Sequence, residues 1–187
     1  MTQIFRIFGF AGSLRKGSYN RALLRSAAEL LPVNVRLDIF DLEGIPPYNQ
    51  DLEQQPTQQV RDFKAGIKAA DALLIATPEY NYSMPGVLKN AIDWGSRPHG
   101  DNVFDDKPLA IMGASPGMTG TARAQYHLRQ SCVYLNMHPL NKPEVMVPFA
   151  KDKIDAEGKL ADEHTRTKIR ELLESLVVWT RRLKKNN

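Results

Sequence analysis

The sequence contains one cysteine, Cys132, among its 187 residues. A single cysteine excludes an intramolecular disulfide and any cysteine-based zinc cluster, and it suits a reducing compartment. Long apolar runs are also missing, since stretches such as residues 72–76 fall far short of the ~20 residues that a membrane-spanning helix needs. Arg6 interrupts the apolar run near the N-terminus, so we expect no signal peptide. The sequence therefore predicts a cytoplasmic protein with no membrane partner.

A large excess of one charge is absent as well. The chain has 25 Lys and Arg against 21 Asp and Glu, a net charge of +4. The excess gathers in residues 181–185, Arg-Arg-Leu-Lys-Lys. These cations are typical either of a nucleic-acid-binding arm or of a solvated helix end, where positive charge favours the helix dipole. Because no aromatic residues are interleaved with them, we favour the helix end and expect no nucleic-acid partner.

What is present suffices for one globular domain. Hydrophobic residues make up 42% of the chain and charged residues 25%, close to the averages of soluble globular proteins. A chain of this length buries roughly 70% of its unfolded surface, so it needs neither a disulfide nor a metal to hold a core. No repeat or linker interrupts it, and residues 1–187 are predicted to form a single domain.

Short apolar runs alternate with stretches of helical periodicity. Five strands are predicted, at residues 4–10, 35–42, 72–77, 109–114 and 144–147. Helices are predicted at residues 23–31, 60–70, 121–136 and 169–183, and after Ser83, which should be an N-cap with Pro85 in the first turn. This alternation predicts an α/β fold, a doubly wound parallel sheet with helices on both faces. Ligands bind such sheets beyond the carboxyl ends of the strands, which directs attention to the loops after the first, third and fourth strands.

The first of these loops, residues 12–20 (Gly-Ser-Leu-Arg-Lys-Gly-Ser-Tyr-Asn), offers groups that bind phosphate. It is not a P-loop, because Ser18 stands where the lysine is required, and its glycines do not fit the dinucleotide fingerprint. Ser13, Ser18 and Asn20 supply short polar side chains, Arg15 and the lysine after it supply cations, and a helix N-terminus follows. This combination suits a terminal phosphomonoester. The alternative is a helix cap without a ligand, with Asn20 as the N-cap.

The other two loops are suited to a flat ligand. Residues 77–86 (Thr-Pro-Glu-Tyr-Asn-Tyr-Ser-Met-Pro-Gly) combine two tyrosines and two prolines into a stiff ledge that could meet the edge of a heterocycle. Residues 115–121 carry glycines that allow the backbone to approach such a ligand closely. Taken singly, the second loop could be a turn whose tyrosines cover the core, and the third an ordinary Gly/Pro turn.

The chain resembles the NADPH-dependent FMN reductase family of flavodoxin-like proteins, most closely its bacterial chromate and quinone reductases. The first two of these loops carry the resemblance most specifically, together with residues 88–94, 125–130 and 141–144. The resemblance implies a five-stranded sheet of order 2-1-3-4-5 with FMN as cofactor. It implies phosphate contacts from Ser13, Arg15, Ser18 and Asn20, and ring contacts from Pro78, Glu79, Tyr80, Asn81, Ser115 and Gly117, those of the second loop through backbone groups. The family often pairs glycines at the end of the third loop, whereas here Thr121 follows Gly120, which should alter the pocket over the ring.

The resemblance also implies an activity. The enzyme would take a hydride from NADPH or NADH in a ping-pong cycle and reduce a small-molecule acceptor, with quinones, chromate, azo and nitro compounds and free flavin left open. The flavin carries the chemistry, so no side chain is assigned as catalytic. The resemblance also implies self-association as a dimer or a dimer of dimers, with Tyr126 and Glu144 at the contact. The alternative for these two residues is ordinary surface and helix packing. The alternatives are a flavodoxin-like electron carrier without NAD(P)H oxidase activity and a nucleotide-binding module without a redox role.

Several reactive side chains are expected to be structural. The four histidines share no metal-ligand spacing, so we expect no metal site. Cys132 falls within a predicted helix and should be a small buried residue rather than a nucleophile. Asp101, Asp105 and Asp106 are interpreted as solvated loop charges.

Overall fold

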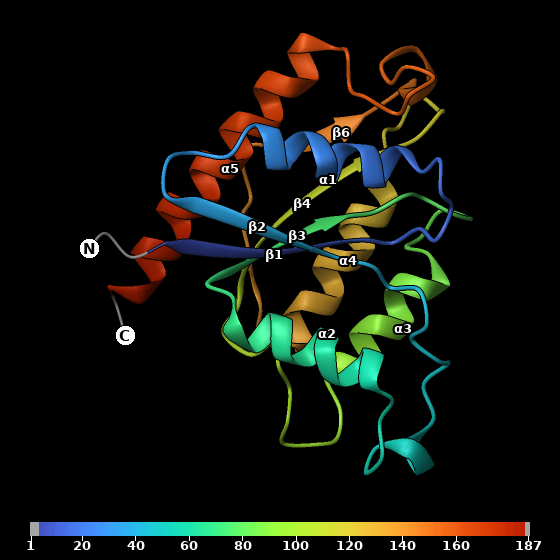
Figure 1. Cartoon of the computed structure of the whole chain (residues 1–187), viewed down its shortest axis with the longest axis vertical. Coiled ribbons are helices and arrows are strands. Elements are labelled where there is room, and N and C mark those ends of the chain that lie inside the picture. The colour runs from blue at the N-terminus through green and yellow to red at the C-terminus, as the bar shows by residue number, and fades with distance from the viewer. Residues whose placement is uncertain (1–3, 186–187) are drawn as a thin grey trace.

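The computed structural model describes residues 4–185; the single-domain prediction also covers residues 1–3 and 186–187, which lie outside the described residues. Strands and helices alternate along the chain (Figure 1). The strands are β1 (Phe5–Ala11), β2 (Val35–Phe40), β3 (Ala72–Ala76), β4 (Pro108–Ala114), β5 (His138–Pro139) and β6 (Val145–Val147). The α-helices are α1 (Tyr19–Glu29), α2 (Gln58–Ala69), α3 (Gly86–Gly95), α4 (Ala122–Tyr134) and α5 (Glu163–Lys184), and short 3₁₀ helices span Gln50–Leu52 and Ala150–Asp152.

The strands form one parallel sheet of order β2-β1-β3-β4-β5, which confirms the predicted topology. The predicted count of five strands is wrong, because two short strands share the fifth position. β5 pairs with the first residues of β4, and β6 with the last three. Pro139 and Pro143 lie at and after the end of β5, and a proline has no N–H to continue a ladder.

Two helical layers cover the sheet. α1 and α5 pack on one face, and α2, α3 and α4 on the other (Figure 1). Along β1, Ile7 and Ala11 belong to the first core, while Phe8 and Phe10 belong to the second, as the two-residue period of a strand requires. The second core holds a cluster of phenylalanine rings, in which Phe63 of α2 lies 6.1 Å from Phe8 between ring centroids. Sheet and helices therefore bury both faces of β1.

The N-cap residues of α1, α2 and α5 cap their helices through side chains, whereas those of α3 and α4 do not. Ser18 caps α1, its Oγ accepting from the N–H of Arg21 at 3.4 Å, so the alternative that made Asn20 the N-cap is wrong. The prediction that Ser83 caps α3 is also wrong, since Pro85 is the N-cap and no side chain caps this helix. Ser83 belongs to the preceding turn, where its backbone pairs with Tyr80, and its Oγ lies 2.9 Å from His127 Nδ1 instead.

Two expectations about the helical residues are confirmed. The cations Arg181, Arg182 and Lys184 lie in the last turn of α5, as the helix-end interpretation predicted. Cys132 is 1% exposed in α4, and its Sγ donates to the carbonyl of Leu128 at 3.2 Å. Burial raises the pKa of this thiol to about 12, so it is not a thiolate nucleophile near neutral pH.

None of the helices between residues 4 and 185 is long and apolar enough to cross a membrane.

Candidate active site

The first two predicted loops emerge side by side at the carboxyl edge of the sheet. The N–H of Gly12 donates to the carbonyl of Ala76, the last residue of β3, at 2.9 Å. A Cβ on Gly12 would lie 3.1 Å from the Cβ of Leu88 and 3.3 Å from the Cδ of Pro78. Glycine therefore lets the two loops lie in close contact, since a side chain here would press against Leu88 and Pro78.

The first loop presents hydroxyl groups and a cation at the start of α1. Ser13 and Ser18 are each 5% exposed, and Ser13 Oγ accepts from the N–H of Arg15 at 3.4 Å. The side chain of Arg15 is exposed, with its guanidinium carbon 5.8 Å from the centroid of the Tyr19 ring. The first turn of α1 holds no acidic residue. The loop thus combines a helix N-terminus, hydroxyl groups and a positive charge, the set that binds phosphate.

Asn20 links the first loop to the third. Its side chain is 2% exposed, and its amide exchanges two hydrogen bonds with the backbone of Ala114, the last residue of β4, at 3.0 and 2.9 Å. An asparagine amide has two N–H hydrogens, so one remains for a ligand. Asn20 therefore fixes the start of the third loop beside the first, whatever it contributes to a phosphate.

The second loop is a tight hairpin with strained tyrosine geometry. Tyr80 and Ser83 exchange two backbone hydrogen bonds of 3.0 Å, and between them Asn81 and Tyr82 have φ of 50° and 67°. Two successive residues with positive φ define a type I′ turn, and a left-handed tyrosine persists only where its surroundings hold it. Tyr80 is 52% exposed and Tyr82 69% exposed. The alternative in which these tyrosines cover the core is wrong.

Glu79 holds this hairpin against α4. Its carboxylate accepts hydrogen bonds from the N–H groups of Arg123 and Ala124 at 3.0 and 3.3 Å and from Arg123 Nε at 2.5 Å. The Glu79 side chain is 7% exposed, and its hydrogen bond raises the pKa of Arg123. The carboxylate thereby caps α4, whose own N-cap residue makes no side-chain cap bond. With its side chain turned to α4, Glu79 has its backbone left for a ligand.

Two further residues of α4 secure the hairpin, and the sequence analysis missed both. The guanidinium carbon of Arg123 lies 3.6 Å from the centroid of the Tyr82 ring, a cation–π contact. His127 Nδ1 lies 2.9 Å from Ser83 Oγ. Their spacing of four residues places both on one helix face, and this was the available signal. This spacing alone could not identify Arg123 and His127, because the sequence does not show that α4 faces the second loop.

The third loop accommodates Thr121 internally. Thr121 has φ of 75° and is fully buried, and its Oγ1 accepts from Gln125 Nε2 at 3.1 Å. A Cβ on Gly113 of β4 would lie 2.0 Å from this Oγ1, so the threonine occupies space that Gly113 leaves. Because Thr121 is buried beneath the loop, it adds nothing to the surface that a ring would meet. Ser115 and Gly117 remain at that surface, joined by a 3.3 Å hydrogen bond.

The residues present fit a phosphorylated flat ring such as FMN. At one end of the edge lie the hydroxyl groups and cation of the first loop, and at the other lies the hairpin. Large apolar side chains stay exposed beside them, including Met118 at 77% and Phe149 at 52%. An edge that pairs anion-binding groups with exposed aromatic and apolar surface is typical of a cofactor site.

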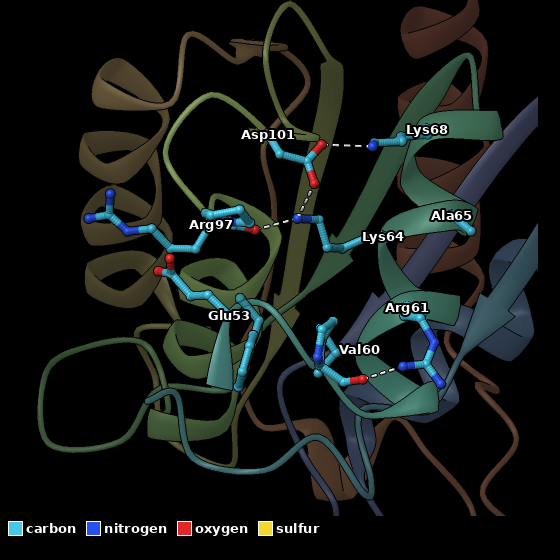
Figure 2. Close-up of a pocket in the computed structure, with 11 residues that line it drawn as sticks. Glu53, Val60, Arg61, Lys64, Ala65, Lys68, Arg97 and Asp101 are labelled. Carbon is cyan, nitrogen blue, oxygen red and sulfur yellow. Dashed lines mark hydrogen bonds and ion pairs between the residues drawn. The ribbon is translucent and has the colours of Figure 1, made fainter. Parts of the chain in front are cut away.

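A separate hollow of about 370 Å³ lies between α2 and the loop after α3, lined by none of the predicted site residues (Figure 2). Lys64 and Lys68 donate to the Asp101 carboxylate at 2.6 and 2.7 Å, and Lys64 also reaches the carbonyl of Arg97. Burial opposes ionisation of Asp101, but the two ammonium groups outweigh it and lower its pKa. The Asp101 side chain is 41% exposed, so it is a partly solvated charge as interpreted, and it also ties its loop to α2.

Two aspartates of the segment before β4 contact residues that follow α4. Across residues 4–185, no group of three or more His, Cys, Asp and Glu side chains is arranged to hold a metal ion. His138 instead pairs with Asp106 at 2.6 Å, and Asp105 accepts from the amide of Asn136 at 2.8 Å. These two contacts join the segment before β4 to the segment after α4, as Asp101 joins its loop to α2.

A parallel sheet of order β2-β1-β3-β4-β5, covered by helices on both faces, is the fold of flavodoxin-like proteins. The sequence matches the NADPH-dependent FMN reductase family over residues 5–152, and the chain belongs to this family. It is thus an FMN-dependent NAD(P)H oxidoreductase, as the resemblance implied, and the electron-carrier alternative is not favoured.

Three relatives are similar over nearly the whole chain. An NAD(P)H-dependent FMN reductase of Pseudomonas aeruginosa is 52% identical over 185 residues, covering 98% of this chain and 100% of the relative. A 2-hydroxy-1,4-benzoquinone reductase of Burkholderia sp. is 45% identical over 170 residues, covering 91% and 93%. The solved structure of FerB, a flavoenzyme NAD(P)H:(acceptor) oxidoreductase of Paracoccus denitrificans, has a TM-score of 0.87 and 33% identity, covering 96% and 98%.

Proposed function

We propose that this enzyme passes electrons from NAD(P)H to quinones through FMN held by the three loops. The observation that carries the proposal is the joining of these loops at one edge, with phosphate-binding groups and an exposed aromatic hairpin side by side. Quinone is the acceptor class that the 2-hydroxy-1,4-benzoquinone reductase relative supports. Chromate, azo and nitro compounds and free flavin are further acceptors compatible with an exposed ring.

Each loop would have its own part in holding FMN. Ser13, Arg15 and Ser18 would bind the phosphate, while Asn20 keeps the third loop in place. The ring would meet two backbone segments, made up of Pro78, Glu79, Tyr80 and Asn81 and of Ser115 and Gly117. Backbone N–H groups aimed at a ring can stabilise negative charge that develops on it, without reorganising during the reaction. When bound, FMN supplies hydride acceptance and electron delivery, which no side chain here can replace.

Donor and acceptor would use the same exposed surface in turn, which is a ping-pong cycle. Arg15 and its neighbouring lysine would attract the anionic donor electrostatically. We also propose a cytoplasmic location, supported by the single buried cysteine, and self-association as a dimer or a dimer of dimers. For the latter, Tyr126 is 55% exposed and Glu144 is also exposed, as residues at a contact between copies would be in the isolated chain.

Steady-state kinetics of the FMN-loaded enzyme test the proposed reaction. We expect NADPH or NADH oxidation with menadione as acceptor, with parallel double-reciprocal lines at several acceptor concentrations. An acceptor panel ranked by kcat/KM should place quinones above chromate, azo dyes, nitro compounds and free flavin. Intersecting lines would reject the ping-pong cycle, and an enzyme that oxidises neither donor with any acceptor would reject the function.

A further inference from the structure

A hollow of about 300 Å³ borders the first loop on the side of β2. It lies between α1 and the end of β2, and Lys16 of the first loop forms part of its wall. Its apolar lining includes Leu24 and Ile39, and Ile39 is 48% exposed although it belongs to a strand. The hollow therefore adjoins the phosphate-binding loop without containing any residue assigned to FMN.

The charges around this hollow are not balanced. Lys16, Arg21 and Arg25 line it, against a single carboxylate, Asp41. Arg21 pairs with Asp41, and Arg25 donates to the neutral carbonyl of Gly158 at 3.0 Å. The exposed Lys16 and Arg25 thus leave about two positive charges without a carboxylate in the wall, next to an apolar surface. A dianion attached to a flat or apolar group fits this combination.

We propose that this hollow binds the adenosine 2′-phosphate end of NADPH and so selects NADPH over NADH. The inference rests on the proposed function, in which Arg15 and Lys16 of the first loop attract the anionic donor. Lys16 and Arg25 hold the phosphate, and Ile39 packs against the adenine. In dinucleotide-binding folds, an acidic residue near the second strand binds the ribose hydroxyls and an arginine accommodates the 2′-phosphate. Here the acidic residue after β2 is Asp41. Because Arg21 pairs with it, the Asp41 carboxylate does not repel a phosphate.

Binding of donor fragments tests the hollow without turnover. Calorimetric titration of FMN-loaded protein should give adenosine 2′,5′-bisphosphate an affinity about tenfold higher than adenosine 5′-monophosphate, since charge-assisted hydrogen bonds to one added phosphate contribute on that scale. Arg25→Gln should abolish this ratio, and Arg25→Lys should retain most of it. Equal affinities in the wild-type protein, or an unchanged ratio in Arg25→Gln, would overturn the proposal.

Kinetics with the two donors provide the second readout. Arg25→Gln should raise KM for NADPH about tenfold while KM for NADH and kcat stay unchanged. Asp41→Asn, which releases the charge of Arg21, should lower KM for NADPH. Arg36→Gln is the matched control, because Arg36 is an exposed cation of β2 outside the hollow, paired with Asp38. If a variant changed KM for NADPH and KM for NADH by the same factor, the hollow would not be the site that selects between the donors.

The two ways of failing are distinct. If neither donor is oxidised, the proposed function fails, and the ratio of the two fragment affinities still tests the hollow. If both donors are oxidised with equal KM and the fragments bind equally, the proposed function stands and this inference is refuted.

Discussion

Replacing Glu79 by alanine is expected to lower the free energy of unfolding by roughly 1–3 kcal/mol, measured by urea denaturation of the FMN-free protein. The carboxylate is 7% exposed and caps α4 by accepting from the N–H groups of Arg123 and Ala124. Its loss leaves these donors without their partner and reduces the contacts of Arg123 with the hairpin to its cation–π contact with Tyr82. The same variant should bind FMN more weakly, because the left-handed Asn81 and Tyr82 lose the anchor that precedes them.

Two variants separate this effect from a general loss of charge. Glu79→Gln keeps an acceptor oxygen for α4 and should destabilise less than Glu79→Ala. Glu171→Gln removes an exposed partner of Lys168, a surface pair 2.8 Å apart, and should change stability by less than about 0.5 kcal/mol. If Glu79→Ala were as stable as Glu171→Gln, the carboxylate would not be what holds α4 and the hairpin together.

Gly66→Ala should destabilise the protein by roughly 1–3 kcal/mol, although alanine ordinarily favours a helix. A Cβ at Gly66 in α2 would lie 2.2 Å from Cε2 of Phe8. That ring cannot move aside easily, because Phe10, Phe40 and Phe63 surround it with centroids 5.5–6.2 Å away. The helix would have to move off the sheet instead.

Gly86→Ala is the matched control for this prediction. Gly86 is the first residue of α3, and a Cβ there would meet nothing within 4 Å. We expect a gain of about 0.4–1 kcal/mol, because alanine restricts the unfolded chain. Thermal and urea unfolding of both variants should therefore give opposite signs. Equal effects would mean that packing against Phe8 does not decide the choice of glycine.

The sequence was most informative where apolar patterns repeat locally. The continuous apolar runs of β3 and β4, and the helical stripe of α5, predicted these elements because burial on both faces or on one face imposes such patterns. The fifth position of the sheet was predicted as one strand, because the two residues of β5 are too few to produce a pattern. The loops of the candidate site were recognised by composition, since Gly, Pro, Ser and Tyr are unusual together.

Contacts between distant segments could not be predicted in the same way. The amide of Asn20 reaches Ala114 across 94 positions, and Glu79 reaches Arg123 across 44. Nothing in local spacing couples such residues. The apparent cap at Ser83 was misleading because Ser83 belongs to the hairpin and its Oγ lies beside His127 of α4. Thr121, which stands where the family often has a second glycine, is explained only by the structure. Its side chain fills the space that Gly113 leaves because Gly113 has no side chain.

The most direct test is titration of the FMN-free protein with FMN and, separately, with riboflavin. Binding is measured by the quenching of flavin fluorescence. The account predicts one FMN per chain, bound at least about tenfold more tightly than riboflavin, because only FMN carries a phosphate for Ser13, Arg15 and Ser18. Arg15→Gln should reduce that preference while leaving riboflavin binding unchanged. Equal affinity for the two flavins, or no binding of FMN by folded protein, would contradict the assignment of the three loops.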